Sequence, residues 1–155
     1  MNVFTYGSLM FASVWARVVR GNYQSTECTI HGFRRVRVRD RLHPALIIAA
    51  NTAPIVGRLY FDVSAEDIVR LDHFETSNYA RVAIAATVGR RAVVAQSYLA
   101  LNVDSLLDED WSVAEFEQHG LAIFNATYVV ENAPPRSELE HDVTQTVRSP
   151  RHVDS

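Results

Sequence analysis

A Gly-Ser pair near the start of the chain separates two segments that are predicted to differ in secondary structure. Val3–Tyr6 has the residues of a short strand, and Phe11–Arg20 places apolar side chains at helical spacing. A strand that turns through glycine into a helix leaves backbone N–H groups without acceptors, with the positive end of the helix dipole behind them. Gly7 and Ser8 therefore offer a turn that can hold a carboxylate or a phosphate. An ordinary turn, with glycine for its conformation and serine as a helix cap, explains the same pair.

Glu75, in the stretch LDHFETSNYARV, is the second candidate and is suited to proton transfer. A helix that opens at Ser64 is predicted to end just before it, so its carboxylate meets the negative end of the helix dipole. Contact with Phe74 would also desolvate the carboxylate, and both effects raise its pKa towards neutrality. A carboxyl group with such a pKa can take up and return protons in catalysis. A solvated loop glutamate is the ordinary alternative, and pairing with Arg81 would lower the pKa instead.

The remaining clusters of polar residues carry weaker signals. In RRVRVRDR, a strand would place the arginines at 35, 37, 39 and 41 on one face and Val36, Val38 and Leu42 on the other, which is typical of a strand with one solvated basic face. Such a face can contact nucleic acid phosphates, so an RNA- or DNA-binding module remains an alternative of a different class. The single cysteine, Cys28, excludes an internal disulfide and a multi-cysteine zinc site. His73 and Glu75 lack the partner spacing of a zinc site, and we expect neither a metal nor a cofactor.

The composition is that of one globular domain. The 155 residues are 48% hydrophobic and 21% charged, with a net charge of −3 that gives no bulk reason to bind nucleic acid or an acidic membrane. All fifteen cationic side chains are arginine, since the chain contains no lysine, and a lysine Schiff base is therefore excluded. The sequence shows no leader segment and no apolar run long enough to span a membrane, so we expect a cytoplasmic protein without a membrane partner.

Strand-like runs and helical segments alternate along the chain and are separated by turn signals. The strand-like runs are Val3–Tyr6, Thr29–Val38, Ala45–Ala50, Ile55–Val63, Tyr79–Val88, Ala92–Leu101 and, more weakly, Thr127–Glu131. Helices are predicted for Phe11–Arg20, from Ser64, and from Ser112, where Gly120 leaves open whether the helix ends or continues. Gly89 is predicted to form a tight hairpin turn. This pattern predicts an α+β domain with a curved antiparallel sheet or a small barrel.

The chain changes character at about residue 132. The stretch NAPPRSELEHDVTQTVRSPRHVDS has two adjacent prolines, no aromatic residue and few apolar groups, so it cannot bury much surface. We therefore predict one domain over residues 1–131 and an extended or disordered tail over residues 132–155.

Taken in order, six segments resemble the γ-glutamylcyclotransferase-like family, which includes the γ-glutamylamine cyclotransferases and the avirulence-induced-gene-like proteins. The segments are FTYGSLM (4–10), HGFRRVRV (31–38), HPAL (43–46), IVGRLYFDV (55–63), LDHFETSNYARV (71–82) and DWSVAEFEQHGLAIF (110–124). Within the fifth segment, Glu75, Tyr79 and Arg81 have the family's E-x-x-x-Y-x-R spacing. The resemblance runs over most of residues 3–130 and implies a small mixed, mostly antiparallel β-barrel with peripheral helices.

The resemblance also assigns roles to individual residues. Tyr6, Gly7, Ser8 and Leu9 correspond to the family's YGSL loop, which holds a γ-glutamyl group through backbone amides, and Glu75 corresponds to the catalytic acid/base glutamate. Met10, Tyr79 and Arg81 are the further candidates for substrate binding. Thr76 is a departure, because the family often has glycine after that glutamate, and a bulkier residue there can narrow the pocket or change which leaving group fits.

The activity that the resemblance implies is cyclisation of a γ-glutamyl amine or γ-glutamyl amino acid to 5-oxoproline, with release of the amine. The substrate's own α-amine attacks its γ-carbonyl carbon, so the partner is a small γ-glutamyl compound and neither a protein nucleophile nor a metal is required. A non-catalytic small-molecule-binding protein on the same fold is the alternative. The sequence leaves open the leaving amine and the oligomeric state, a homodimer included.

Overall fold

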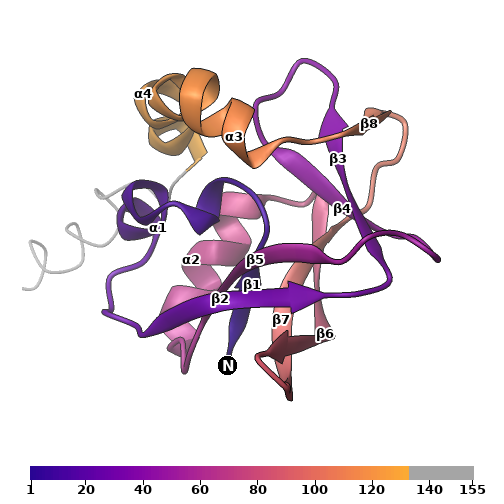
Figure 1. Ribbon diagram of the computed structural model, residues 1–155. Coiled ribbons are helices and arrows are strands. Elements are labelled where there is room, and N and C mark those ends of the chain that lie inside the picture. The colour runs from indigo at the N-terminus through magenta and orange to yellow at the C-terminus, as the bar shows by residue number, and fades with distance from the viewer. Residues whose placement is uncertain (133–155) are drawn as a thin grey trace, which may run out of the picture.

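The computed structural model describes residues 1–132 and consists of a closed barrel, a smaller sheet and a layer of helices (Figure 1). Neighbouring barrel strands are antiparallel, except that β1 and β7 run parallel where the barrel closes, with Val3 opposite Gln96. In barrel order the strands are β1 (Val3–Thr5), β5 (Ile55–Tyr60), β2 (Ser25–Ile30), β6 (Tyr79–Val88) and β7 (Arg91–Ala100). The predicted fold class, a small mixed and mostly antiparallel barrel with peripheral helices, is confirmed.

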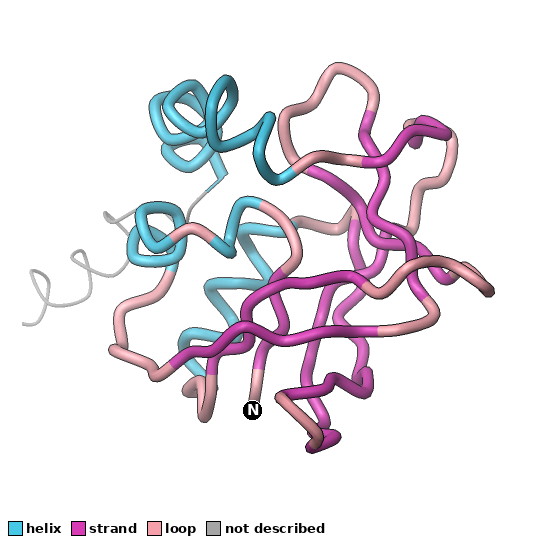
Figure 2. The backbone as a smooth tube through the Cα atoms, in the orientation of Figure 1, coloured by secondary structure: helices cyan, strands magenta, loops and turns pink. Residues whose placement is uncertain are grey.

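The second sheet has three antiparallel strands and lies beside the barrel (Figure 2). Its order is β4 (Pro44–Ile48), β3 (Phe33–Val38) and β8 (Leu106–Asp110). The helices are a one-turn 3₁₀ helix η1 (Ser8–Met10), α1 (Ala12–Val18), α2 (Ala65–Glu75), α3 (Val113–Glu115), the π-helical turn η2 (Phe116–Gly120) and α4 (Leu121–Asn132). Helices α1, α2 and α4 gather on one side of the barrel (Figure 1). Within residues 1–132, no helix is long and apolar enough to cross a membrane.

Two hydrophobic clusters form the main core. One fills the barrel around Phe4, Leu59 and Ile84, and the other lies under the helices, where the rings of Trp15 and Tyr60 stack with their centroids 3.6 Å apart. The C-terminal end of α2 and the loop between β1 and η1 lie where these clusters adjoin, since Phe74 belongs to the helical cluster and Tyr6 to the barrel cluster.

Buried polar contacts anchor the N-terminal end of α2. The Ser64 hydroxyl accepts a hydrogen bond from the backbone N–H of Asp67 at 3.2 Å, which is the predicted cap. The carboxylate of Asp67 is itself only 1% exposed and accepts hydrogen bonds from the backbone amides of Arg20 and Gly21, the Tyr23 hydroxyl and the Arg70 guanidinium. Burial acts to raise the pKa of Asp67, but these hydrogen bonds outweigh it and lower the pKa.

The structure corrects several predicted elements. The run Thr29–Val38 is two strands, β2 and β3, separated at His31 and Gly32 and placed in different sheets. The weak strand predicted at Thr127–Glu131 is wrong, because this segment belongs to α4, whose buried Phe124 packs between the Phe74 and Phe116 rings. Strand β8 was not predicted.

Two other features of the sequence are settled by the structure. The helix from Ser112 continues past Gly120, and the predicted hairpin turn at Gly89 is confirmed, with a φ of 60°. Most of the predicted tail, residues 133–155, lies outside the described residues.

Replacing Asp67 tests the anchor of α2. We expect Asp67→Ala to lower the free energy of unfolding by about 3 kcal/mol, since two backbone amides and a half-buried guanidinium lose a charged acceptor. Urea unfolding followed by circular dichroism measures the change. Glu66→Ala, at the neighbouring exposed position of the same helical turn, is the matched control and should shift stability by less than about 0.5 kcal/mol. Equal effects of the two substitutions would contradict this account of the anchor.

Candidate active site

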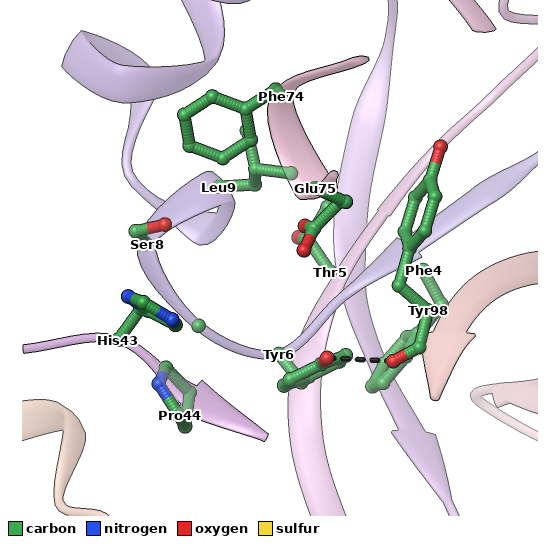
Figure 3. Close-up of a pocket in the computed structure, with 11 residues that line it drawn as sticks. Phe4, Thr5, Tyr6, Ser8, Leu9, His43, Pro44, Phe74, Glu75 and Tyr98 are labelled. Carbon is green, nitrogen blue, oxygen red and sulfur yellow. Dashed lines mark hydrogen bonds between the residues drawn. The ribbon is translucent and has the colours of Figure 1, made fainter. Parts of the chain in front are cut away.

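A cavity lies where the loop after β1 faces the C-terminal end of α2, so the two segments singled out in the sequence converge (Figure 3). It is narrow, with a volume of about 20 Å³, which is room for about one water molecule or one polar group of a ligand. Four separate parts of the chain line it: Phe4, Thr5, Tyr6, Gly7, Ser8 and Leu9; His43 and Pro44; Phe74 and Glu75; and Tyr98. We call this cavity the slot.

The loop at one wall of the slot carries unused backbone donors. The amides of Met10 and Phe11 donate to the carbonyls of Gly7 and Ser8, at 3.0 and 3.1 Å. Those of Gly7, Ser8 and Leu9 donate to no other residue in the described part of the chain. Ser8 does not cap α1, which begins at Ala12 with Phe11 at its N-cap, so the ordinary explanation of a capping serine does not hold.

Gly7 is required by a close approach between two segments. A Cβ atom at this position would lie 2.7 Å from the Cγ and Cδ atoms of Pro44, which is closer than real Cβ contacts allow. Only glycine therefore lets the first residue of β4 pack directly against the loop. This contact places His43 and Pro44 in the wall opposite Glu75.

Glu75 is the last residue of α2, and its carboxyl points into the slot on the side of Ser8 and His43 (Figure 3). Burial, with a smaller contribution from the nearby charge of Asp72, raises its pKa from 4.5 to about 8. Arg81, which was considered as a partner that would lower this pKa, instead donates to the Asp72 carboxylate at 2.9 Å. The raised pKa that the sequence suggested for Glu75 is therefore present, with burial as its main cause, and the catalytic role of this residue stays a prediction.

Tyr98 lines the slot and Asp72 lies behind it, and neither residue was identified from the sequence. The Tyr98 hydroxyl donates to Asp72 Oδ1 at 2.7 Å, and the Tyr6 hydroxyl donates to the Tyr98 backbone carbonyl at 2.6 Å. Burial raises the pKa of both tyrosines far above their ordinary value, so both hydroxyls stay protonated. The only sequence signal for Asp72 was its position one helical turn before Glu75.

Arg35 supports the loop from outside the slot. Its Nη1 donates to the Tyr6 carbonyl at 2.9 Å and to the Val56 carbonyl at 3.3 Å, and its guanidinium lies over the Trp111 ring, 5.4 Å from the centroid. The predicted solvated basic face is therefore wrong for this residue, which is half-buried. Arg37 is exposed on β3 as predicted. Arg39 and Arg41 are also exposed, but their predicted place on the strand is wrong, because β3 ends at Val38 and they lie in the turn that follows.

His43 was assigned no role from the sequence, yet it lines the slot. Burial, together with the nearby charge of Arg41, lowers its pKa to about 4, so the imidazole is neutral at pH 7. The other candidates, Met10, Tyr79 and Arg81, do not line the slot. The Tyr79 hydroxyl donates to the Pro44 carbonyl at 3.3 Å. The Met10 sulfur accepts from the Arg35 guanidinium, and the Arg81 guanidinium donates to the Asp72 carboxylate.

A family model described as gamma-glutamyl cyclotransferase, AIG2-like, matches residues 3–113. The chain belongs to this family. Within the family it is similar to two proteins of Arabidopsis thaliana. It is 23% identical to AIG2-like protein A over 95% of this chain and 92% of that protein, and 32% identical to AIG2-like protein D over 52% of each. A solved gamma-glutamyl cyclotransferase superimposes with a TM-score of 0.58 at 12% identity, covering 94% of this chain and 98% of the other, which shows the common fold.

Thr76, which directly follows Glu75, has a backbone conformation that glycine favours. Its φ of 68° and ψ of −179° lie in a region that costs other residues about 1–3 kcal/mol. We expect Thr76→Gly to raise the free energy of unfolding by about 1 kcal/mol, because the relief of strain exceeds the entropy that glycine adds to the unfolded chain. Thermal unfolding measures the change. Ser77→Gly, at the next exposed position, is the control and should destabilise; a loss of stability in Thr76→Gly would contradict the prediction.

The raised pKa of Glu75 predicts a specific dependence of stability on pH. Below pH 4.5 the carboxyl is protonated in both the folded and the unfolded state, so its burial costs nothing. Between pH 4.5 and about 8 it ionises only in the unfolded state, so folding is progressively destabilised. We expect Glu75→Gln to be more stable than the wild type by on the order of 3 kcal/mol at pH 8, and by less than about 1 kcal/mol at pH 5. Urea unfolding at both pH values checks this, with Glu66→Gln as control; parallel pH profiles for wild type and Glu75→Gln would refute it.

Proposed function

We propose that this family member cyclises γ-glutamyl compounds to 5-oxoproline, with Glu75 as the general acid/base and the Tyr6–Leu9 loop as the γ-glutamyl site. The observation that supports the proposal most is the convergence of a buried, proton-accepting carboxyl and a run of unused backbone donors on one slot. An intramolecular cyclisation needs this pair of features and no protein nucleophile.

The proton transfers account for the position and pKa of Glu75. The substrate's α-ammonium group must lose a proton before its nitrogen can attack the γ-carbonyl carbon. Of its three hydrogens, one stays on the ring nitrogen of 5-oxoproline and two end on the departing nitrogen, which leaves as an ammonium ion. Glu75 can carry these two protons one at a time. With a pKa of about 8 it is a far better match to an amine than a solvated glutamate would be.

The loop amides can act on the γ-carbonyl oxygen. As the amine attacks, the γ-carbonyl oxygen gains negative charge, and the N–H groups of Gly7, Ser8 and Leu9 are available to stabilise it. They can equally hold the polar end of the flexible γ-glutamyl chain, which reduces the entropy cost of bringing nitrogen and carbonyl together. Since the slot itself holds only one small polar group, substrate binding requires its walls to move apart.

Formation of 5-oxoproline tests the proposal directly. The protein is incubated with a panel of γ-glutamyl dipeptides and γ-glutamylamines, and 5-oxoproline is quantified by mass spectrometry. We expect turnover of at least one class, kcat/KM rising with pH until Glu75 is ionised near pH 8, and a loss of roughly 10²–10⁴-fold in Glu75→Gln. Glu66→Gln, on the exposed face of the same helix, is the control and should match the wild type.

Two results would contradict different parts of the proposal. If the wild type binds γ-glutamyl compounds but makes no 5-oxoproline, the protein is a non-catalytic small-molecule binder. Thr76 is the one departure from the family pattern that favours this alternative. If Glu75→Gln is as active as the wild type, the cyclisation stands but another group moves the proton. The nucleic-acid alternative gains no support, because Arg34 and Arg37 form ion pairs with the acidic strand β8.

A further inference from the structure

A second and wider cavity adjoins the slot, and the function proposed above does not use it. Its volume is about 460 Å³, and it shares His43 with the slot. Thr76, the residue that follows Glu75, lies in its wall. The lining comes from the turn after β3, the segment after α2, and the end of β7 with the loop that follows: Val38, Arg39, Arg41, His43, Thr76, Asn78, Tyr79, Ala100, Asn102, Ser105 and Leu106. We call it the outer pocket.

Two arginines give the outer pocket a positive charge. Arg39 and Arg41 are both exposed, and none of the ion pairs within residues 1–132 involves either of them. Four other arginines are paired with carboxylates: Arg34, Arg37, Arg70 and Arg81. Asp40 lies in the same turn and Asp104 in the facing loop, but neither lines the pocket.

The positive charge extends to the boundary with the slot. The charge of Arg41 contributes, after burial, to the low pKa of His43, which forms the wall common to both cavities. Among the described residues the lining contains no carboxylate, and its other side chains are either polar, such as Asn78, Asn102 and Ser105, or apolar, such as Val38 and Leu106. A negatively charged group in the outer pocket would therefore meet two guanidinium groups without displacing a carboxylate that already holds them.

The outer pocket lies where the leaving group of a bound γ-glutamyl compound would extend. The bond that breaks joins the γ-carbonyl carbon to the leaving nitrogen, so the leaving group extends away from Glu75 and the loop. The outer pocket begins at Thr76 and His43, directly beside this point. In an amino acid leaving group, the α-carboxylate is attached one carbon away from that nitrogen, so it would enter the outer pocket first.

We propose that the outer pocket binds the leaving group and that Arg39 and Arg41 select a leaving group that carries a carboxylate. The substrates would then be γ-glutamyl compounds of amino acids, in preference to γ-glutamyl compounds of simple amines. Thr76, held in its strained conformation with its hydroxyl accepting the Asn78 amide at 3.4 Å, forms part of the boundary across which the substrate lies. This inference rests on the proposed function, because it assigns the leaving group of that same reaction.

A matched pair of substrates tests the selection. γ-Glutamylalanine and γ-glutamylethylamine differ only by the carboxylate, so the ratio of their kcat/KM values isolates its contribution. We expect the wild type to favour γ-glutamylalanine by roughly tenfold, the size expected for a carboxylate held by two exposed guanidinium groups. In the double variant Arg39→Gln/Arg41→Gln the ratio should fall to near one, and raising the salt concentration should lower the wild-type ratio in the same direction.

Arg90→Gln is the matched control for charge. Arg90 is exposed in the turn between β6 and β7, at the end of the hairpin opposite Tyr79 and Ala100, and so about 30 Å of strand away from the outer pocket. It removes one positive charge without touching the pocket, and its ratio should equal that of the wild type. A wild-type ratio of one or less, or a ratio that Arg39→Gln/Arg41→Gln leaves unchanged, would overturn the inference.

Binding measurements separate a failure of this inference from a failure of the proposed function. Calorimetry gives the dissociation constants of the two compounds for the Glu75→Gln protein, with and without the two arginine substitutions. If the wild type turns over neither of these two compounds nor any other member of the γ-glutamyl panel described above, cyclisation fails. The arginine site stands in that case only if γ-glutamylalanine still binds roughly tenfold more tightly and loses this advantage in the arginine variant. Equal dissociation constants for the two compounds would overturn it.

Discussion

The burial of one carboxyl group, that of Glu75, is the constraint on which the site depends. An ionised carboxylate in this position is poorly solvated and faces the negative charge of Asp72, so its pKa is raised to about 8. Such a group stays buried only if the element that carries it cannot turn it out to solvent. Helix α2 is held at its first turn by the hydrogen bonds to Asp67 and near its last turn by buried Phe74, and both contacts oppose that rotation. The reactivity of the site is therefore linked to the stability of one helix.

The barrel and the two segments of the site could be predicted because their signals are local. β-Branched residues mark the long hairpin β6–β7. The boundaries of β6 at Tyr79 and Val88 match those predicted, and those of β7 differ by one residue. The serine cap at Ser64 marks the start of α2, and the capped helix then carries Glu75 one turn beyond the buried Leu71. The Gly-Ser turn was visible in the same way, through an abrupt change from strand to helix pattern.

What the sequence did not reveal depends on contacts between distant residues. Arg35 binds the Tyr6 carbonyl across 29 positions, and Tyr98 reaches Asp72 across 26, and no local pattern marks either pair. The α4 segment after Ile123 has a composition that suits a strand, but Phe124 packs against Phe74 and Phe116, and this tertiary contact decides in favour of a helix. Strand β8 is short and acidic, and it forms only because β3 offers it a partner with Arg34 and Arg37.

Within residues 1–132, the ion pairs distinguish the arginines that are neutralised by a carboxylate from Arg39 and Arg41, which are not. The acidic residues of β8 neutralise the basic strand β3, and Asp72 neutralises Arg81, so these guanidinium groups serve the fold. The turn after β3 is held by its backbone instead, since the Arg39 amide donates to the Ser105 carbonyl at 2.8 Å and the Arg41 amide to the Val38 carbonyl at 3.1 Å. Its two guanidinium groups are thus not needed to form the turn. Charge that the fold does not use, placed in the cavity beside a protonated carboxyl, raises the local concentration of anions there.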